Sequence, residues 1–188
     1  MPFDFTAAMR ELIADIAATC PELGHLDLSL IAVTFSQTRA ARLGGVQATI
    51  LPLRFPDGSR IQERPHGTYE LPLVKLDGRE MLYVVAFRLP RFLNRPFQEK
   101  MTTVVHEMYH ISPDFDGTLR RFEGGKPYHT GSRRRYDAAM AAAAGRYLEA
   151  TRRPELHGFL HRSFAELAAA HGGVVAMKMR GIRLRRIR

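Results

Sequence analysis

The chain has 188 residues, 45% of them hydrophobic and 25% charged, which is enough for one buried core and too few for two domains of ordinary size. We therefore expect a single domain spanning residues 1–188. The lone Cys20 excludes an internal disulfide and fits a reducing, cytoplasmic compartment. No basic leader with an apolar core opens the chain, and its longest apolar run, residues 138–144, is far shorter than a bilayer span, so we expect no membrane partner.

The formal net charge is +9 at pH 7, from 28 Lys and Arg residues against 19 Asp and Glu, and most of the cations are arginines. Such an Arg-rich surface attracts polyanions without any specific site. It therefore favours at most non-specific nucleic-acid binding and gives no indication that bases are read. A solvated basic face explains the same composition equally well.

The N-terminal half predicts one helix followed by strands. An apolar stripe at helical spacing, with Asp4 able to cap its start, indicates a helix over residues 5–17. Alternating apolar positions then predict four extended segments, at residues 28–35, 46–55, 69–76 and 80–89. The dipeptide Asp77-Gly78 lies between the last two and is typical of a hairpin turn.

The C-terminal half predicts three helices and one long loop. Asn94 and Pro96 can open a helix over residues 96–111, which Ser112-Pro113 closes. The polar, glycine-containing residues 114–129 read as an irregular loop, and two further helices are expected, at residues 131–151 and 154–170. The basic C-terminal segment 174–188 alternates apolar and cationic side chains like a strand. The elements indicate an α+β fold with a small mixed or antiparallel sheet and a final basic strand.

Residues 106–110 read His-Glu-Met-Tyr-His, which is the pattern His-Glu-x-x-His inside a segment predicted to be helical. Residues four apart share one helix face, so His106 and His110 can converge on one tetrahedral Zn²⁺ ion, at about 2.0–2.1 Å from each nitrogen. Glu107 can act as general base by taking a proton from a zinc-bound water. An apolar back face would anchor the helix in the core: Val104, Met108 and Ile111. With eight histidines in the chain, chance occurrence of the pattern is the competing interpretation.

A third protein ligand would leave the fourth position to water, as in catalytic rather than structural zinc sites. The chain after the motif offers four residues with side chains that can bind zinc: Asp114, Asp116, Glu123 and His129. The two aspartates suit a tight turn, and Glu123 precedes two glycines that break a helix. We favour His129, because the glycine-containing loop can return the chain over the metal just before the next helix.

Hydrolysis also needs a group that stabilises the developing oxyanion. Four side chains near the motif can supply one: Tyr109, Tyr128, Tyr136 and Lys126. We favour Tyr128 because it adjoins His129. Tyr109, inside the motif, is expected to pack or to hold a hydrogen bond behind the metal ligands.

From residue 104 to residue 137 the chain resembles the family of phage metallopeptidases and, more distantly, the SprT-like zincins. The resemblance lies in the motif and the residues up to Gly117, and in His129-Thr130-Gly131 opening a helix. It implies a zincin-like fold in which a small sheet precedes the active-site helix, a zinc cofactor, His129 as third ligand, and a protein or peptide substrate. The basic loop between His110 and His129 does not match the family residue by residue, which leaves the substrate open. Some SprT-like proteases act on DNA-bound proteins, which would suit the basic charge.

Three functions therefore stand side by side. The first is a zinc metallopeptidase with Glu107 as general base. The second is a basic nucleic-acid-binding protein with a structural zinc site, and the third is a metal hydrolase acting on a non-protein amide. Glu107 distinguishes the first two, because a structural site does not need an unligated carboxylate beside the metal.

Overall fold

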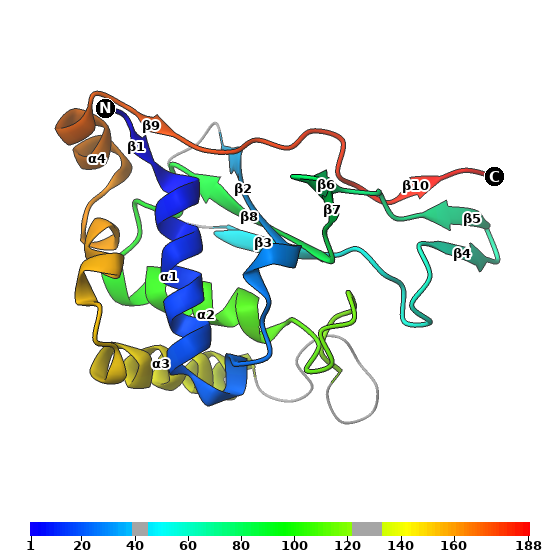
Figure 1. Cartoon of the computed structure of the whole chain (residues 1–188), viewed down its shortest axis with the longest axis horizontal. Helices are drawn as coiled ribbons and strands as arrows, with labels where there is room; N and C mark the ends of the chain where they lie inside the picture. Colours follow the sequence, from blue (N-terminus) through cyan, green and yellow to red (C-terminus); the bar gives the residue numbers. More distant parts are fainter. Residues whose placement is uncertain (39–44, 122–132) are drawn as a thin grey trace.

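The computed structural model describes residues 1–38, 45–121 and 133–188, apart from the side chains of Arg133 and Arg134 (Figure 1). The chain begins with strand β1 (Phe3–Asp4) and helix α1 (Phe5–Thr19), followed by two 3-10 turns, η1 (Pro21–Leu23) and η2 (Leu28–Leu30). The Asp4 carboxylate accepts a hydrogen bond from the backbone N–H of Ala7 at 3.0 Å, so the predicted N-cap is confirmed. The apolar stripe of α1 is buried, as its spacing predicted.

The central sheet has three strands in the order β2 (Ile31–Gln37), β8 (Tyr83–Leu89) and β3 (Ala48–Pro52). β2 pairs with β8 in parallel, and β3 pairs with β8 in the antiparallel sense. The α+β class and the small mixed sheet are therefore confirmed. The strands differ from the predicted segments at their ends: β2 covers residues 31–37 where 28–35 was expected, β3 is shorter than 46–55, and β8 begins at Tyr83 where residue 80 was expected.

The two faces of this sheet belong to two different cores. Ile31 and Val33 point into the main core, which α1 and helix α2 (Phe97–Tyr109) cover. Ala32 lies between Ile31 and Val33 in β2, and Val84 is its partner in β8. Both point to the other face and join a smaller apolar cluster. Helices thus cover one face of the sheet, whereas the other face is covered by a hairpin and by the C-terminal segment, through Met179 and Ile182.

A second, smaller sheet projects from the body near the C-terminus (Figure 1). Its order is β10 (Arg185–Arg186), β5 (Gly67–Glu70) and β4 (Ile61–Arg64), and both pairings are antiparallel. The sequence patterns did not predict β4. The single strand expected over residues 69–76 is wrong, because β5 ends at Glu70 and Pro72, which lacks an N–H, follows two residues later.

The hairpin predicted at Asp77-Gly78 is confirmed. It joins β6 (Lys75–Leu76) to β7 (Arg79–Glu80), with Lys75 opposite Glu80 and Leu76 opposite Arg79. Both turn residues have positive φ, 49° at Asp77 and 78° at Gly78, which is the conformation that a two-residue hairpin turn of the primed type requires.

The predicted C-terminal helices are present, but the second is divided. Helix α3 spans Arg133–Ala150, and the helix expected over residues 154–170 is a 3-10 segment, η3 (Pro154–His161), followed by α4 (Phe164–His171). Ser163 starts α4 with a capping box, because its hydroxyl accepts from the N–H of Glu166 while the Glu166 carboxylate accepts from the N–H of Ser163. Asn94, expected to open α2, instead accepts a hydrogen bond from the N–H of Phe164 at 3.1 Å.

The strand expected over residues 174–188 is confirmed only at its two ends. β9 (Val174–Val175) pairs in parallel with β1, and β10 pairs with β5. Between them the chain crosses from one sheet to the other, touching β2 where the Met177 carbonyl accepts from the N–H of Phe35 at 2.9 Å. A regular strand needs a continuous partner, and none runs beside residues 178–184 in the described part of the chain.

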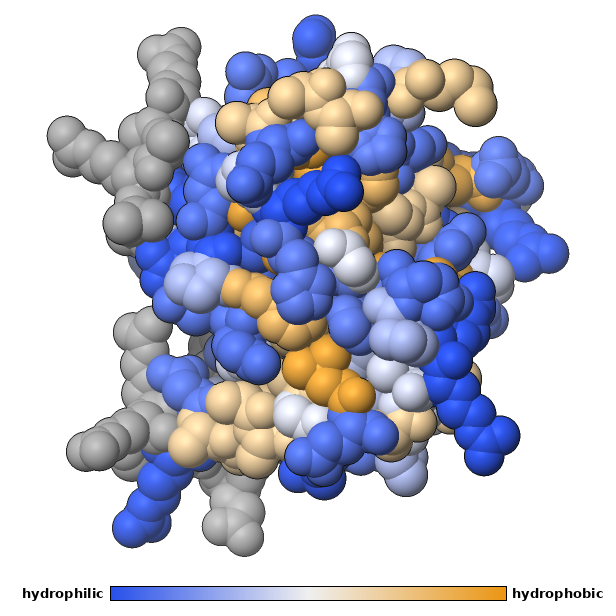
Figure 2. Space-filling view, turned by 90° about the vertical axis from the view of Figure 1, so that its left-hand side faces the viewer, coloured by the Kyte–Doolittle hydropathy of each residue, from blue (hydrophilic) through white to orange (hydrophobic). Residues whose placement is uncertain are grey.

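Within the described ranges, no helix has both the length and the apolar character that crossing a bilayer requires. Figure 2 shows the side of the molecule on which α4 lies. Hydrophilic side chains cover most of this face, and the apolar side chains on it form patches that hydrophilic ones interrupt. This face therefore offers no broad apolar surface.

Candidate metal centre

Helix α2 is held in the core by its back face. Met101, Val104 and Met108 are fully buried, and Pro96 stands at the N-cap position, where a missing N–H costs nothing. Lys100 fixes the first turn of the helix, because its ammonium donates to the carbonyl oxygens of Leu93 at 2.7 Å and Arg162 at 2.9 Å. The two motif histidines lie away from this anchored side and converge on each other.

The two motif histidines converge. His106 lies in the last turn of α2 and His110 is its C-cap, and their Nε2 atoms are 3.0 Å apart. Two nitrogens bound to one tetrahedral zinc ion at about 2.05 Å each would be about 3.3 Å apart. The imidazoles thus need only a small separation to hold such an ion, so the donor pair fits zinc in spacing and in chemistry.

Glu107 lies beside this pair and is almost wholly buried, with 9% of its surface exposed. Burial disfavours the charged carboxylate and raises the pKa of Glu107 to about 7, although an interaction with the backbone N–H of Ile50 opposes part of that rise. A carboxyl group with a pKa near neutral can both take up and release a proton at physiological pH, as a general base that later acts as an acid must do.

A cleft of about 860 Å³ opens at the motif. His106, Glu107 and Thr103 of α2 form one wall, Ala48 and the residues leading into β3 form another, and Asp137 of α3 closes the end. The cleft therefore brings the motif together with the edge of the central sheet, a juxtaposition that the sequence patterns did not predict.

The edge strand β3 turns backbone groups toward this cleft. The Gln47 carbonyl and the Leu53 N–H bond to the β8 side of the sheet. Because successive residues of a strand alternate in direction, Ala48 and Ile50 present their N–H and C=O groups to the opposite side. The interaction of the Ile50 N–H with Glu107 agrees with this orientation. The cleft thus has a backbone edge along one wall.

Tyr136 of α3 packs against both histidines. Its ring centroid lies 5.1 Å from that of His106 in an edge-on arrangement, and 6.2 Å from that of His110 with the planes inclined by 24°. Burial raises the pKa of its hydroxyl above the usual range, so the group stays protonated. Tyr136 was one of four candidate oxyanion groups in the sequence. Its contact with the histidines follows from the packing of α3 on α2, which no local pattern predicts.

The chain just after the motif folds back onto the end of α2. Ile111 forms an isolated antiparallel bridge with Leu119, and the Arg120 N–H donates to the His110 carbonyl at 2.7 Å. The Arg120 guanidinium lies 4.1 Å from the centre of the Tyr109 ring and donates to the Tyr109 carbonyl. Tyr109 therefore packs, as expected of it.

The aspartates considered as third ligands lie in this turn. One carboxylate oxygen of Asp116 accepts from the backbone N–H of Thr118 at 3.0 Å and from its hydroxyl at 2.7 Å, which is turn chemistry. The Asp114 side chain is exposed. Across residues 1–38, 45–121 and 133–188, no third His, Cys, Asp or Glu joins the two motif histidines in a group that could hold a metal.

The other predicted site residues lie outside the described residues. These are the preferred third ligand, the preferred oxyanion group and two alternatives: His129, Tyr128, Glu123 and Lys126. Their roles stay predictions.

His157 and His161, also four residues apart, pack rather than converge. The His161 ring stacks on Phe97 with centroids 3.8 Å apart, and the His157 and His161 centroids are 6.0 Å apart. They therefore lie outside the candidate site and can serve as control positions when zinc binding is tested.

Comparisons with models of protein families, with curated proteins and with solved structures gave no match.

Proposed function

We propose that the protein is a zinc metallopeptidase of the zincin-like type. The observation that carries the proposal is the convergence of His106 and His110, 3.0 Å apart at Nε2, with the buried Glu107 carboxyl beside them in a cleft. His106 and His110 would hold the ion, and His129 would complete the set. Zinc in such a site acts as a Lewis acid that polarises a carbonyl and makes water acidic enough to react near neutral pH.

Three further roles would fall to residues of this chain: general base, positioning of the metal ligands and stabilisation of the oxyanion. Glu107, with a pKa raised to about 7, accepts the proton of the attacking water and passes it to the leaving amine. Tyr136 holds the imidazoles in their converging orientation through its ring contacts. Tyr128 stays the proposed donor to the developing oxyanion.

The shape of the cleft supports a peptide as substrate. An extended peptide can bind by adding a strand to an exposed sheet edge, and β3 presents the N–H and C=O of Ala48 and the C=O of Ile50 on this side, whereas the Ile50 N–H interacts with Glu107. The scissile bond of such a peptide would lie over Glu107, which already meets the Ile50 N–H. A small non-protein amide would leave most of this edge unused.

The test combines zinc content with peptidase activity. We expect about one zinc per chain in the wild type, a loss of zinc affinity of at least about 10-fold in His106→Ala and His110→Ala, and full zinc in the matched control His161→Ala. Glu107→Gln should retain zinc and lose about 100-fold or more of the activity. A wild type that binds no zinc under zinc-replete conditions would falsify the proposal. Full activity in Glu107→Gln would show that Glu107 is not the general base, and a wild type that holds zinc without peptidase activity would point to a structural site.

A further inference from the structure

The C-terminal segment, residues 178–188, concentrates positive charge on one exposed stretch of chain. It contains no acidic residue and six cations, which equal two thirds of the net charge of +9. All six are exposed: Lys178, Arg180, Arg183, Arg185, Arg186 and Arg188. Five of the six are arginines, whose planar guanidinium groups bind phosphate oxygens in a bidentate manner.

The C-terminal segment is anchored by its apolar side chains and its backbone, which leaves the cations on the outside. Met179 and Ile182 pack on the smaller apolar cluster beneath the central sheet. Near the end, the Ile187 N–H donates to the Thr68 carbonyl at 2.9 Å and the Arg188 carbonyl accepts from the Thr68 N–H at 3.1 Å. The row of charges is therefore held in place, so less conformational entropy is lost when a ligand binds to it.

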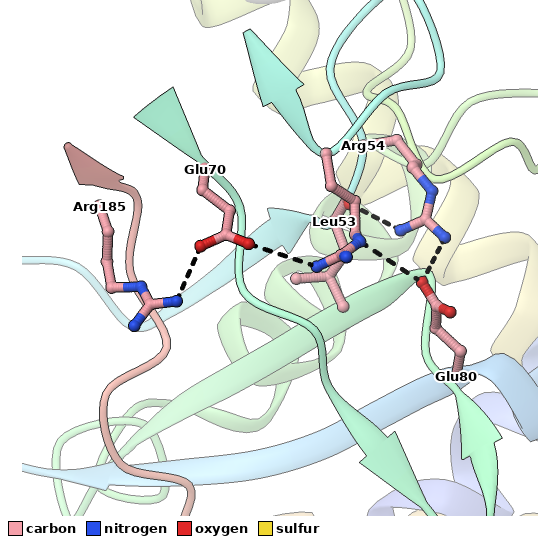
Figure 3. Close-up of polar contacts among 6 residues, drawn as sticks. Leu53, Arg54, Glu70, Glu80 and Arg185 are labelled. Atoms are coloured by element: carbon pink, nitrogen blue, oxygen red, sulfur yellow. Dashed lines mark hydrogen bonds and ion pairs between the residues drawn. The ribbon is translucent and has the colours of Figure 1, made fainter. Parts of the chain in front are cut away.

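A relay of ion pairs ties this segment to the body (Figure 3). Arg185 pairs with Glu70 at 2.8 Å, Arg60 lies between Glu70 and Glu80, and Glu80 also pairs with Arg54. The relay uses the carboxylates of β5 and β7 to hold Arg185. Arg186 donates to the Arg188 carbonyl at 2.9 Å, whereas Lys178, Arg180 and Arg183 precede β10 and form no ion pair with a carboxylate among the described residues.

We propose that the C-terminal segment binds the phosphodiester backbone of nucleic acid without reading its bases. β10 is an outer strand of its sheet, so a long polyanion can lie along it, whereas a closed pocket would admit only a small anion. In extended chain successive cations lie about 7–10 Å apart, except for the adjacent Arg185 and Arg186, and such a row suits a ligand with regularly repeated charges. The segment contains no aromatic residue on which a base could stack, so the contacts are to phosphate and the binding is independent of sequence.

An acidic protein or an anionic membrane is the competing kind of partner. Met179 and Ile182 face the protein, and although Leu184 and Ile187 are 37% and 46% exposed, the segment forms no amphipathic helix that could lie in a bilayer surface. Nucleic acid has the highest linear charge density of these partners, and so gains most from a row of arginines.

The experiment measures binding of a labelled short DNA duplex by fluorescence anisotropy across a range of salt concentrations. The test variant is Arg180→Gln/Arg183→Gln/Arg188→Gln, which leaves Arg185 and the ion-pair relay intact. The matched control is Arg152→Gln/Arg153→Gln/Arg162→Gln, three exposed arginines around η3, at the end of the molecule opposite the C-terminus (Figure 1). Both triples remove the same charge, so general electrostatic attraction is lowered equally in the two proteins.

We expect the test variant to bind about 10-fold or more weaker at about 100 mM salt, with a salt slope shallower by about 2–3. The control should change affinity by less than about 3-fold, and two duplexes of unrelated sequence should bind equally. Any of three results would overturn the proposal. The first is an equal loss of affinity in both triple variants, and the second is an absence of wild-type binding at low salt. The third is stronger competition by polyglutamate or anionic vesicles than by unlabelled DNA. Zinc plays no part in this readout, so its result is independent of the peptidase assay.

Discussion

Tyr136 of α3 packs edge-on against His106 of α2, with ring centroids 5.1 Å apart and planes at 87°. The residues are 30 positions apart in the chain, and the contact exists because α3 packs alongside α2 (Figure 1). It makes the orientation of a proposed metal ligand depend on a residue outside the motif.

The ring and the hydroxyl of Tyr136 can be separated by substitution. Tyr136→Phe keeps the ring contacts with His106 and His110, so we expect zinc affinity within about 3-fold of wild type. Tyr136→Leu removes the aromatic packing and should weaken zinc binding by about 10–100-fold. Competition with a chelating dye measures both. A fall in kcat in Tyr136→Phe at full zinc occupancy would assign the hydroxyl, rather than that of Tyr128, to transition-state stabilisation.

The third ligand can be identified by comparing two substitutions. His129→Ala should lose bound zinc while the metal-free protein keeps its stability. Asp116→Ala should keep zinc but lower the free energy of unfolding by about 1 kcal/mol, because it removes both acceptor contacts to Thr118. Elemental analysis and urea unfolding of the metal-free proteins measure the two effects. Loss of zinc in Asp116→Ala with full zinc in His129→Ala would reverse the assignment.

Lys100 should give the protein a stability that rises with pH. Burial lowers the pKa of Lys100 to about 8 in the folded state, from 10.5 for the free side chain. Between pH 8 and pH 10.5 the folded state has released the proton that the unfolded state still binds, so the free energy of unfolding increases with pH across that window. Below pH 8 both states are protonated and the full cost of burying the charge, up to about 3 kcal/mol, is present.

Comparison with Lys100→Met isolates this effect from other groups that titrate at high pH. The difference in unfolding free energy, wild type minus variant, should rise by about 1–3 kcal/mol from pH 7.5 to pH 10. Denaturant unfolding at several pH values measures it. A difference that stays flat over this range would show that the Lys100 ammonium, with its two carbonyl acceptors, keeps an ordinary pKa in the fold.

Gly117 should be the more sensitive of two glycines that share one backbone conformation. Its φ is 84° and that of Gly58 is 79°, so alanine is strained at both positions. A Cβ at Gly117 would lie 2.7 Å from Cγ of Arg54, whereas a Cβ at Gly58 meets nothing within 4 Å. We expect Gly58→Ala to cost about 1 kcal/mol and Gly117→Ala about 1–3 kcal/mol more. Thermal and urea unfolding measure both. Equal costs would mean that Arg54 moves aside freely.

Local features of this protein were predictable from short stretches of sequence. The cap at Asp4, the turn at Asp77-Gly78 and the buried back face of α2 each depend on residues within about one or two turns of each other, so propensity and periodicity suffice. The pairing of His106 with His110 belongs to the same class, because four residues in a helix bring two side chains to one face.

Only the tertiary structure decided what surrounds the motif. The Ile50 N–H at Glu107 and the Tyr136 ring on the histidines both depend on segments far apart in the chain. The same holds for the C-terminal segment, which is a regular strand only where β1 and β5 offer a partner. The division of the expected last helix at Ser163 is different, because its capping box with Glu166 is a local signal that the periodicity of that segment did not reveal. Strand pairing and helix packing are set by long-range burial, and this is encoded in the whole chain rather than in any window of it.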